Sequence, residues 1–151
     1  FERVVETKVA GLRHLLASIL PDDLRLLGVF SSYTARYGRV GQCDYAIANE
    51  VLNKQSRQFA IEHPQTHVVS FNWGPWDGGM VTGGLRKLFA SEGVGLIPLA
   101  DGAGLLVREF VQNVSRPVEL LVISEPDDVK TLRRQEEQKA AEASRRPMPH
   151  G

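Results

Sequence analysis

A tyrosine and an asparagine stand four residues apart in a segment that reads as a helix. Tyr45 and Asn49 belong to the run QCDYAIANEVLN, and residues spaced i and i+4 share one face of a helix. A tyrosine hydroxyl has an ordinary pKa of about 10, so it gives up a proton near neutral pH only where cations stabilise the phenolate. The pair therefore either delivers a proton to a ligand or contains a core tyrosine with a satisfied hydroxyl.

A lysine could supply that positive charge. Lys54 lies nine residues after Tyr45, about 180° around the same helix, so it cannot serve. Lys87 falls in a segment whose position relative to Tyr45 the sequence pattern does not predict. Lys8 lies at about 40° on a first predicted helix whose large apolar residues span about 0° to 160°. It projects from the apolar stripe, where it either snorkels to water or supplies charge to a neighbour. Lys8 is therefore the best candidate on geometric grounds.

Two serines follow directly on a short apolar run that suits a buried strand, Ser31 and Ser32. Ligands of parallel α/β sheets gather at the carboxyl ends of strands, so a serine there is placed to hydrogen-bond a carbonyl oxygen. A loop- or helix-capping role is the alternative. Neither a GxSxG motif nor an evident histidine base accompanies the pair, which argues against nucleophilic catalysis. The loop 74–84 also leaves a strand, and it either holds a ligand amide through its N–H groups or is a plain crossover.

Alternating helices and strands must position these side chains. Helical periodicity predicts helices at about 4–21, 42–62, 85–92 and 101–113. Apolar runs predict strands at about 25–32, 67–73 and 118–124. Glycines punctuate a predicted loop at 33–41. This order, with strands buried on both faces, indicates an α/β fold with a parallel sheet.

The predicted sheet looks like half of a larger fold. Three strands are few for this architecture, and no glycine-rich dinucleotide turn follows the first strand. We therefore expect either a fragment or a chain that a partner completes. Residues 1–124 form the expected folded part. Residues 125–151 are charged with little apolar periodicity, which indicates a linker or frayed helix.

Composition limits the classes of function. The 151 residues include 18 Lys+Arg and 18 Asp+Glu, for a formal net charge of zero, which argues against a commitment to nucleic acid or an anionic membrane surface. No apolar run reaches the ~18–20 residues that span a bilayer, and the first residues lack the order of a signal peptide. One cysteine and four scattered histidines give no zinc spacing. We expect no metal site and a reducing, cytoplasmic setting.

Three runs of the sequence resemble a known family: FSSYTARYGRVGQCDYAIANEVLN, VVSFNWGPWDGGMV and GVGLIPL. They are similar to the ketoreductase domain of modular polyketide and polyunsaturated fatty acid synthases, a branch of the short-chain dehydrogenase/reductase family. In this branch, asparagine stands four residues after the tyrosine and the active lysine comes from the preceding helix. Ser32 stands 13 residues before Tyr45, and Lys8 stands 24 before Ser32, as in the ketoreductase pattern. The resemblance covers about residues 1–124 and implies the C-terminal half of a Rossmann-like parallel sheet with flanking helices.

The resemblance implies NADPH-dependent reduction of a β-ketoacyl thioester on an acyl carrier protein. Tyr45 would donate a proton to the keto oxygen as hydride arrives from NADPH, and Ser32 would orient that oxygen. Lys8 would stabilise the phenolate and contact the nicotinamide ribose, so that Lys8 and Tyr45 would also bind the cofactor. Asn49 would hold the water or backbone geometry of a proton relay.

The resemblance also assigns two loop segments. The nicotinamide would be bordered by Gly74, Pro75 and Trp76. A mobile lid over the substrate would include Met80, Val81 and Leu85. Implied partners are the carrier-bound substrate and the remainder of a synthase chain, through which a homodimer could form.

Two departures from the family pattern concern cofactor binding and stereochemistry. The family's Gly-rich turn and 2′-phosphate-binding arginine are not in this chain, so we expect negligible NADPH affinity for the chain alone. Tyr37 stands where one stereochemical class often has tryptophan. Two alternatives remain open: a catalytically silent, ketoreductase-like interaction domain, and another short-chain reductase or epimerase acting on a free small molecule.

Overall fold

A three-stranded parallel sheet forms the centre of the chain in a computed structural model that describes residues 2–19, 23–79, 81–111, 118–126, 129–131, 133 and 137. Its strands are β1 (Leu26–Ser32), β2 (His67–Trp73) and β3 (Glu119–Val122), in the spatial order β1-β2-β3. Ser32 is opposite Trp73, which is in turn opposite Val122. The carboxyl ends of all three strands therefore meet at one edge, and the predicted α/β fold with three parallel strands is confirmed.

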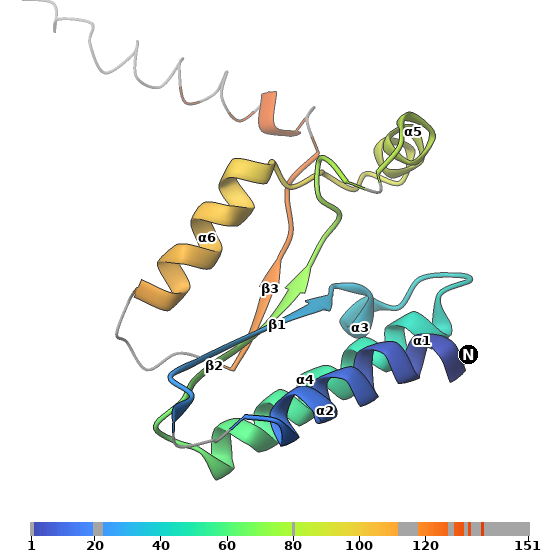
Figure 1. The fold of residues 1–151 in the computed structure, drawn as a ribbon. Coiled ribbons are helices and arrows are strands. Elements are labelled where there is room, and N and C mark those ends of the chain that lie inside the picture. Colours follow the sequence, from blue (N-terminus) through green and yellow to red (C-terminus); the bar gives the residue numbers. More distant parts are fainter. Residues whose placement is uncertain are drawn as a thin grey trace, which may run out of the picture.

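Helices lie on both faces of this sheet (Figure 1). In chain order they are α1 (Glu2–Val5), the π-helical η1 (Glu6–Ala10), α2 (Gly11–Ala17), α3 (Thr34–Tyr37), α4 (Cys43–Glu62), α5 (Gly83–Ser91) and α6 (Leu99–Val111). The rod made by α1, η1 and α2 lies beside α4 on one face, and α6 lies on the other. Helix α5 stands away from both layers, beyond the loop that leaves β2.

The central strand β2 separates two apolar clusters. Side chains alternate between the faces of a strand, so Val68 packs with the cluster under α4 and Val69 with the cluster under α6. The first cluster contains Leu12, Leu27, Val29, Leu52, Phe59 and Val68. The second contains Val69, Phe71, Trp73 and Ile97. Because burial of each large apolar side chain is worth about 1.5–3 kcal/mol, these clusters hold both helical layers on the sheet.

The prediction that every strand is buried on both faces is wrong for β1. Leu27 and Val29 are buried, but Leu26 and Phe30 on the opposite face are 46% and 50% exposed. Helix α6 approaches this face of β1 at Gly28, where the lack of a side chain leaves room for the ring of Phe110. The sequence pattern shows only that the strand is apolar. Whether its second face is buried depends on how far α6 extends across the sheet.

Two helical segments also differ from the predictions. The expected loop at 33–41 contains α3, a single turn that ends at Gly38, whose positive φ of 67° favours glycine. The first helical rod ends at Ala17 rather than near residue 21, and it is π-helical from Glu6 to Ala10. Such wide turns occur frequently at functional sites, and this one carries Lys8.

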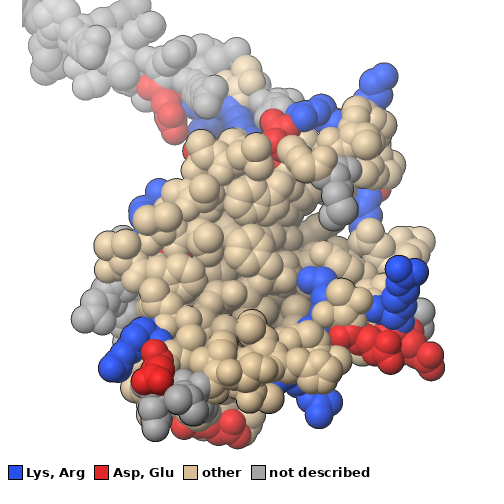
Figure 2. Space-filling model, viewed as in Figure 1, with Lys and Arg blue, Asp and Glu red and all other residues tan. Residues whose placement is uncertain are grey.

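Much of the expected linker 125–151 lies outside the described residues. Within the described part of the chain, no helix has the length and apolar character required to cross a membrane. In the same part, no three His, Cys, Asp or Glu side chains gather in a way that could hold a metal ion. Figure 2 shows one face of the molecule, with charged side chains around its rim and a largely uncharged centre.

Candidate active site

One pocket of about 1140 Å³ at the carboxyl ends of β1 and β2 brings most of the predicted site residues together. Those that line it are Lys8, Ser32, Tyr45, Gly74, Pro75, Trp76, Val81 and Leu85. Asn49 is fully buried beneath Tyr45 and does not line the pocket. Met80 lies outside the described residues. Parallel strands end at a common edge, which is why residues from η1, β1, α4 and the loop after β2 converge there.

Lys8 contacts both the strand and the tyrosine. Its Nζ donates a hydrogen bond to the backbone oxygen of Phe30 at 3.3 Å and lies 5.3 Å from the centroid of the Tyr45 ring. Burial lowers the pKa of the Lys8 ammonium because desolvation disfavours the charged form. Lys54, in contrast, pairs with Glu50 at 2.8 Å on the far side of α4. The cation beside Tyr45 is therefore Lys8.

Asn49 connects α4 to the strand that carries the serines. Its Nδ2 donates to the backbone oxygen of Tyr45 at 2.7 Å, and its own backbone oxygen accepts from Ser31 Oγ at 3.1 Å. The Oδ1 atom of Asn49 is buried and has no hydrogen-bond partner among the described residues. Buried polar atoms are normally satisfied, so this oxygen can still accept a hydrogen bond from a water molecule or a ligand.

The hydroxyl of Ser32 is oriented by a residue two positions later. Ser32 Oγ accepts the backbone N–H of Thr34 at 3.2 Å, and Thr34 Oγ1 lies 2.9 Å from the same oxygen. Both residues are buried. Because the amide can only donate, it takes one acceptor position of Ser32 Oγ. When Thr34 also donates, the hydroxyl hydrogen of Ser32 is left free to reach a ligand in the pocket.

Aromatic side chains form one wall of the pocket. The Trp73 ring lies 5.5 Å from that of Phe30 and 4.7 Å from that of Trp76, measured between centroids. The Nε1 atom of Trp73 is buried and has no partner among the described residues. The backbone of Trp76 pairs with that of Ile97 in an isolated parallel β-bridge. A flat, uncharged ring would fit against this wall.

A glycine on α6 sets the position of Trp76. A Cβ atom at Gly102 would lie 2.6 Å from Cζ3 of the Trp76 ring, closer than real side-chain contacts allow. We expect Gly102→Ala to lower the free energy of unfolding by about 1–3 kcal/mol through overpacking and to displace Trp76. Denaturant titration would measure the first effect and tryptophan fluorescence the second. Gly104→Ala, with only Arg108 Nη1 at 3.8 Å, is the control, and equal stability of the two variants would contradict the prediction.

Several residues of the pocket were not predicted from the sequence. They come from the α3 region and from the end of α5: Tyr33, Thr34, Arg39, Phe89 and Glu92. Thr34 could have been found, because hydroxyl side chains two residues apart after a strand often share hydrogen bonds. Arg39 and Glu92 stand 53 positions apart, and no local pattern links them.

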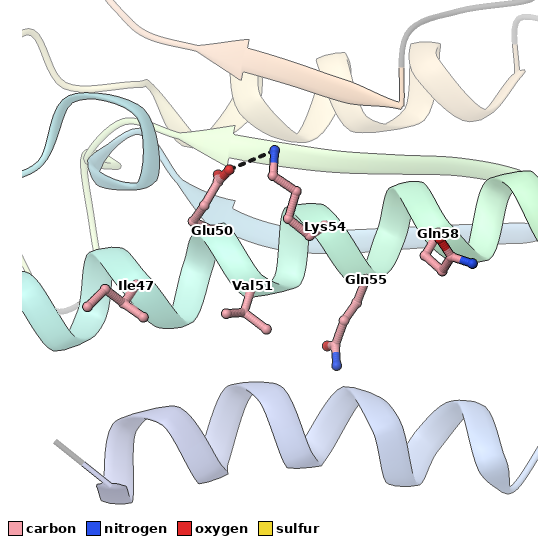
Figure 3. Close-up of a pocket in the computed structure, with 6 residues that line it drawn as sticks. All are labelled: Ile47, Glu50, Val51, Lys54, Gln55 and Gln58. Atoms are coloured by element: carbon pink, nitrogen blue, oxygen red, sulfur yellow. Dashed lines mark ion pairs between the residues drawn. The ribbon is translucent and has the colours of Figure 1, made fainter.

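A second hollow lies over the outer side of α4 (Figure 3). Its apolar side chains Ile47 and Val51 point toward the N-terminal helical rod, whereas Glu50 and Lys54 point the other way and form an ion pair. None of the predicted acid–base residues line it. Its two ionisable side chains, Glu50 and Lys54, are paired with each other, so the candidate chemistry belongs to the pocket beside Tyr45.

The pocket can stabilise negative charge that develops on a carbonyl oxygen. Two hydroxyl donors, Ser32 and Tyr45, border it, and a desolvated ammonium lies behind the tyrosine. Donors and a cation that are held in place before reaction are an effective way to lower the barrier of such a step.

Comparison with known proteins identifies relatives of the chain. Residues 1–78 match the KR domain family. The chain is 43% identical over 122 residues to a polyunsaturated fatty acid synthase chain of Thraustochytrium sp., an alignment that covers 81% of the chain. It is 40% identical over 95 residues to the polyketide synthase GfsA of Streptomyces halstedii, which covers 62% of the chain.

A solved structure shows the same fold. The ketoreductase from the first module of phoslactomycin biosynthesis in Streptomyces sp. HK803 aligns over 74% of the chain, with a TM-score of 0.61 and 29% identity. The chain spans only a small part of these proteins: 4% of the fatty acid synthase, 1% of GfsA and 25% of the solved ketoreductase.

Proposed function

Because the chain belongs to the KR domain family of polyketide and fatty acid synthases, we propose that it forms the proton-delivering part of an NADPH-dependent β-ketoacyl reductase. Lys8, Ser32, Tyr45 and Asn49 are its catalytic residues. The observation that carries the proposal is the placement of the Lys8 ammonium 5.3 Å from the Tyr45 ring in a pocket that Ser32 also lines. Its substrate is a β-ketoacyl thioester, which becomes the β-hydroxyacyl form.

The pocket fits the nicotinamide end of the cofactor that members of this family bind. The aromatic wall of Trp73 and Trp76 and the segment Gly74–Pro75 suit a flat ring. Lys8, which lines the same pocket, would contact a ribose hydroxyl. When bound, the cofactor supplies hydride to the carbonyl carbon. The residues that would hold it are Lys8, Tyr45, Gly74, Pro75 and Trp76.

The chain's own residues handle the proton. As negative charge develops on the keto oxygen, Ser32 donates a hydrogen bond to it and Tyr45 transfers its phenolic proton to it. The Lys8 ammonium stabilises the resulting phenolate, because a cation within a few ångströms favours the charged form. Asn49 holds the backbone of Tyr45 through its Nδ2 group. Its free Oδ1 would hold a water that returns a proton to the site.

Thr34 supports this step by keeping Ser32 a donor toward the substrate. Thr34→Val keeps the shape of the side chain and removes the hydroxyl that lies 2.9 Å from Ser32 Oγ. We expect kcat to fall by about 3- to 10-fold, as for the loss of one hydrogen bond. Thr34→Ser should restore most of the rate. The measurement is steady-state NADPH oxidation.

A matched control comes from a second buried threonine. Thr66 donates to the backbone oxygen of Leu24 at 2.8 Å and does not line the pocket. Thr66→Val should therefore lower stability and leave kcat unchanged. An equal fall in kcat for the Thr34 and Thr66 variants would show that Thr34 contributes only to folding.

We also propose that residues 1–124 are the C-terminal part of the catalytic domain and that residues 125–151 are a charged linker or frayed helix. The complete domain then consists of this chain together with the segment or partner that supplies the cofactor-binding half. The exposed face of β1, with Leu26 and Phe30, supports such a completing half, because a further layer would bury these side chains. The acyl chain would be carried by an acyl carrier protein and would lie under a lid that includes Val81 and Leu85; Met80 is the third lid residue proposed.

The test of the proposed function is an assay of the complete domain. It measures NADPH oxidation with a β-ketoacyl thioester and, separately, with a small free ketone. Turnover of the thioester supports a ketoreductase. Turnover of the free ketone alone would identify another short-chain reductase, and no turnover of either would indicate a silent interaction domain.

A further inference from the structure

Arg39 makes three separate contacts inside the pocket. Its Nη2 lies 3.1 and 2.9 Å from the two carboxylate oxygens of Glu92. Its guanidinium carbon lies 4.7 Å from the centroid of the Phe89 ring. Its Nη1 donates to the hydroxyl of Tyr33 at 3.2 Å. We call this set of contacts the Arg39 bridge. All four residues line the pocket that holds Tyr45.

The Arg39 bridge joins two segments that are far apart in the chain. Phe89 lies in the last turns of α5, and Glu92 follows its end. Arg39 lies between Gly38 and Gly41, both with positive φ, in the loop that leads into α4 and Tyr45. Tyr33 directly follows Ser32. The bridge therefore connects the helix that closes the pocket to both segments that carry the proposed donors.

The surroundings make this ion pair stronger than an ordinary surface pair. The Arg39 side chain is only 18% exposed and that of Glu92 41%. Stacking on the buried ring of Phe89 adds a cation–π contact, which gains strength when partly desolvated. Exposed ion pairs that lack such support often contribute little. A guanidinium held at three points in this way is suited to fixing the position of a helix.

The wall that α5 presents to the pocket is apolar. Leu85, Leu88 and Phe89 line it from the helix, and Val40 lines it from the facing loop. If α5 moved away, an acyl chain would lose contact with three of these side chains. The hydroxyl donors, which belong to β1 and α4, would stay in place. Binding of the acyl chain and chemistry at the carbonyl therefore depend on different parts of the pocket.

We propose that Arg39 is a positioning residue that holds α5 against the loop 38–42 and so forms the apolar wall that binds the acyl chain of the substrate. This inference rests on the proposed ketoreductase function for its substrate. Loss of the bridge weakens substrate binding and spares the proton transfer.

The experiment compares four variants of the complete domain with the wild type. Arg39→Met keeps the aliphatic stem and removes the charge, and Glu92→Gln removes the partner's charge. Arg39→Glu combined with Glu92→Arg reverses the pair. Lys54→Met removes the Lys54–Glu50 ion pair, 2.8 Å long and outside this pocket, and serves as the matched control. Each protein is assayed with a short-chain and a medium-chain β-ketoacyl thioester of N-acetylcysteamine.

Arg39→Met is expected to raise KM by about tenfold for the medium-chain thioester and by less for the short one, with kcat within about threefold of the wild type. Glu92→Gln should raise KM in the same direction, and the reversed pair should recover part of the loss. Lys54→Met should leave both constants unchanged. An unchanged KM in Arg39→Met, or a fall in kcat of more than about threefold that is equal for both substrates, would overturn the proposal.

Hydrogen exchange separates this inference from the proposed function. The amides of α5 should exchange about tenfold faster in Arg39→Met than in the wild type, while those of α6 keep their rates. Equal protection of α5 in both proteins would overturn the bridge whatever the activity. If the wild type reduces no thioester, the proposed function fails, and the exchange of α5 alone decides whether Arg39 holds this helix.

Discussion

Replacing Tyr45 by phenylalanine is expected to lower kcat of the complete domain by about 10²–10⁴-fold, the range that general acid catalysis contributes. The substitution removes one oxygen and keeps the ring that lies under the Lys8 ammonium. The fold should therefore change little, and the fall in kcat should exceed any fall in NADPH affinity. The rate falls because the variant keeps the hydrogen bond that Ser32 is proposed to donate and lacks the phenolic proton that Tyr45 is proposed to transfer.

The measurement is NADPH oxidation with a β-ketoacyl thioester, together with the fluorescence titration of NADPH binding. Tyr37→Phe is the matched control, because Tyr37 is 69% exposed and does not line the pocket. Wild-type turnover in Tyr45→Phe would contradict the assignment of the proton donor. Equal losses in the two variants would point to a general effect on the domain.

Replacing Lys8 by methionine is expected to lower kcat by about 10²-fold, the lower range found for the loss of one preorganised electrostatic group. Methionine preserves most of the side-chain volume but cannot stabilise the phenolate of Tyr45 or donate to the backbone oxygen of Phe30. Lys54→Met is again the control. Turnover near the wild-type rate in Lys8→Met would show that the ammonium is not part of the reaction.

The same substitution should raise the free energy of unfolding rather than lower it. Burial lowers the pKa of Lys8 in the folded state, so the unfolded chain binds this proton more tightly. Between the lowered pKa and the ordinary value, the wild type therefore gains stability as the pH rises. Lys8→Met removes the desolvated cation and should lack this gain. Denaturant titrations at neutral and alkaline pH would measure it, and a variant that is less stable at neutral pH would contradict the expected effect.

The lowered pKa of Lys8 also bears on the rate. The ammonium is lost at a lower pH than that of an exposed lysine, so its support for Tyr45 should fall away as the pH rises through that lowered value. We expect the activity of the wild type to fall on the alkaline side. The activity of Lys8→Met should be low throughout and should depend less on pH.

Much of the fold follows from local patterns in the sequence. Apolar residues at helical spacing predict α4, and short apolar runs predict β1 and β2, each within a residue or two. The reason is that α4 buries one face, whereas β2 is buried along almost its whole length. The break at His63–Pro64 ends α4 as expected. The parallel order follows because each strand is separated from the next by a helix.

Several residues of the candidate site were also within reach of the sequence. Ser32, Tyr45 and Asn49 lie in one continuous run, at the end of a strand and on one helix face. Lys8 stood out as a charge on an apolar stripe, and the structure places it against Tyr45. These predictions depend on spacing along single elements, which the sequence records directly.

The remaining features depend on contacts between elements. The exposed face of β1 depends on the reach of α6, and the buried Oδ1 of Asn49 depends on where Ser31 meets α4. The donor orientation of Ser32 depends on the α3 turn that places Thr34, where a loop was predicted. Each of these features is decided by packing, since local preference alone allows more than one conformation.

The sequence by itself determined the order of helices and strands and the chemical types of the residues proposed to deliver the proton, because periodicity and residue identity are local properties. Only the tertiary structure decided that α5 is held over the pocket by Arg39 and Glu92, which are 53 positions apart in the chain. That contact requires β2 to lie beside β1 and the chain beyond β2 to turn back over the pocket. No local pattern encodes a meeting that depends on the assembled sheet.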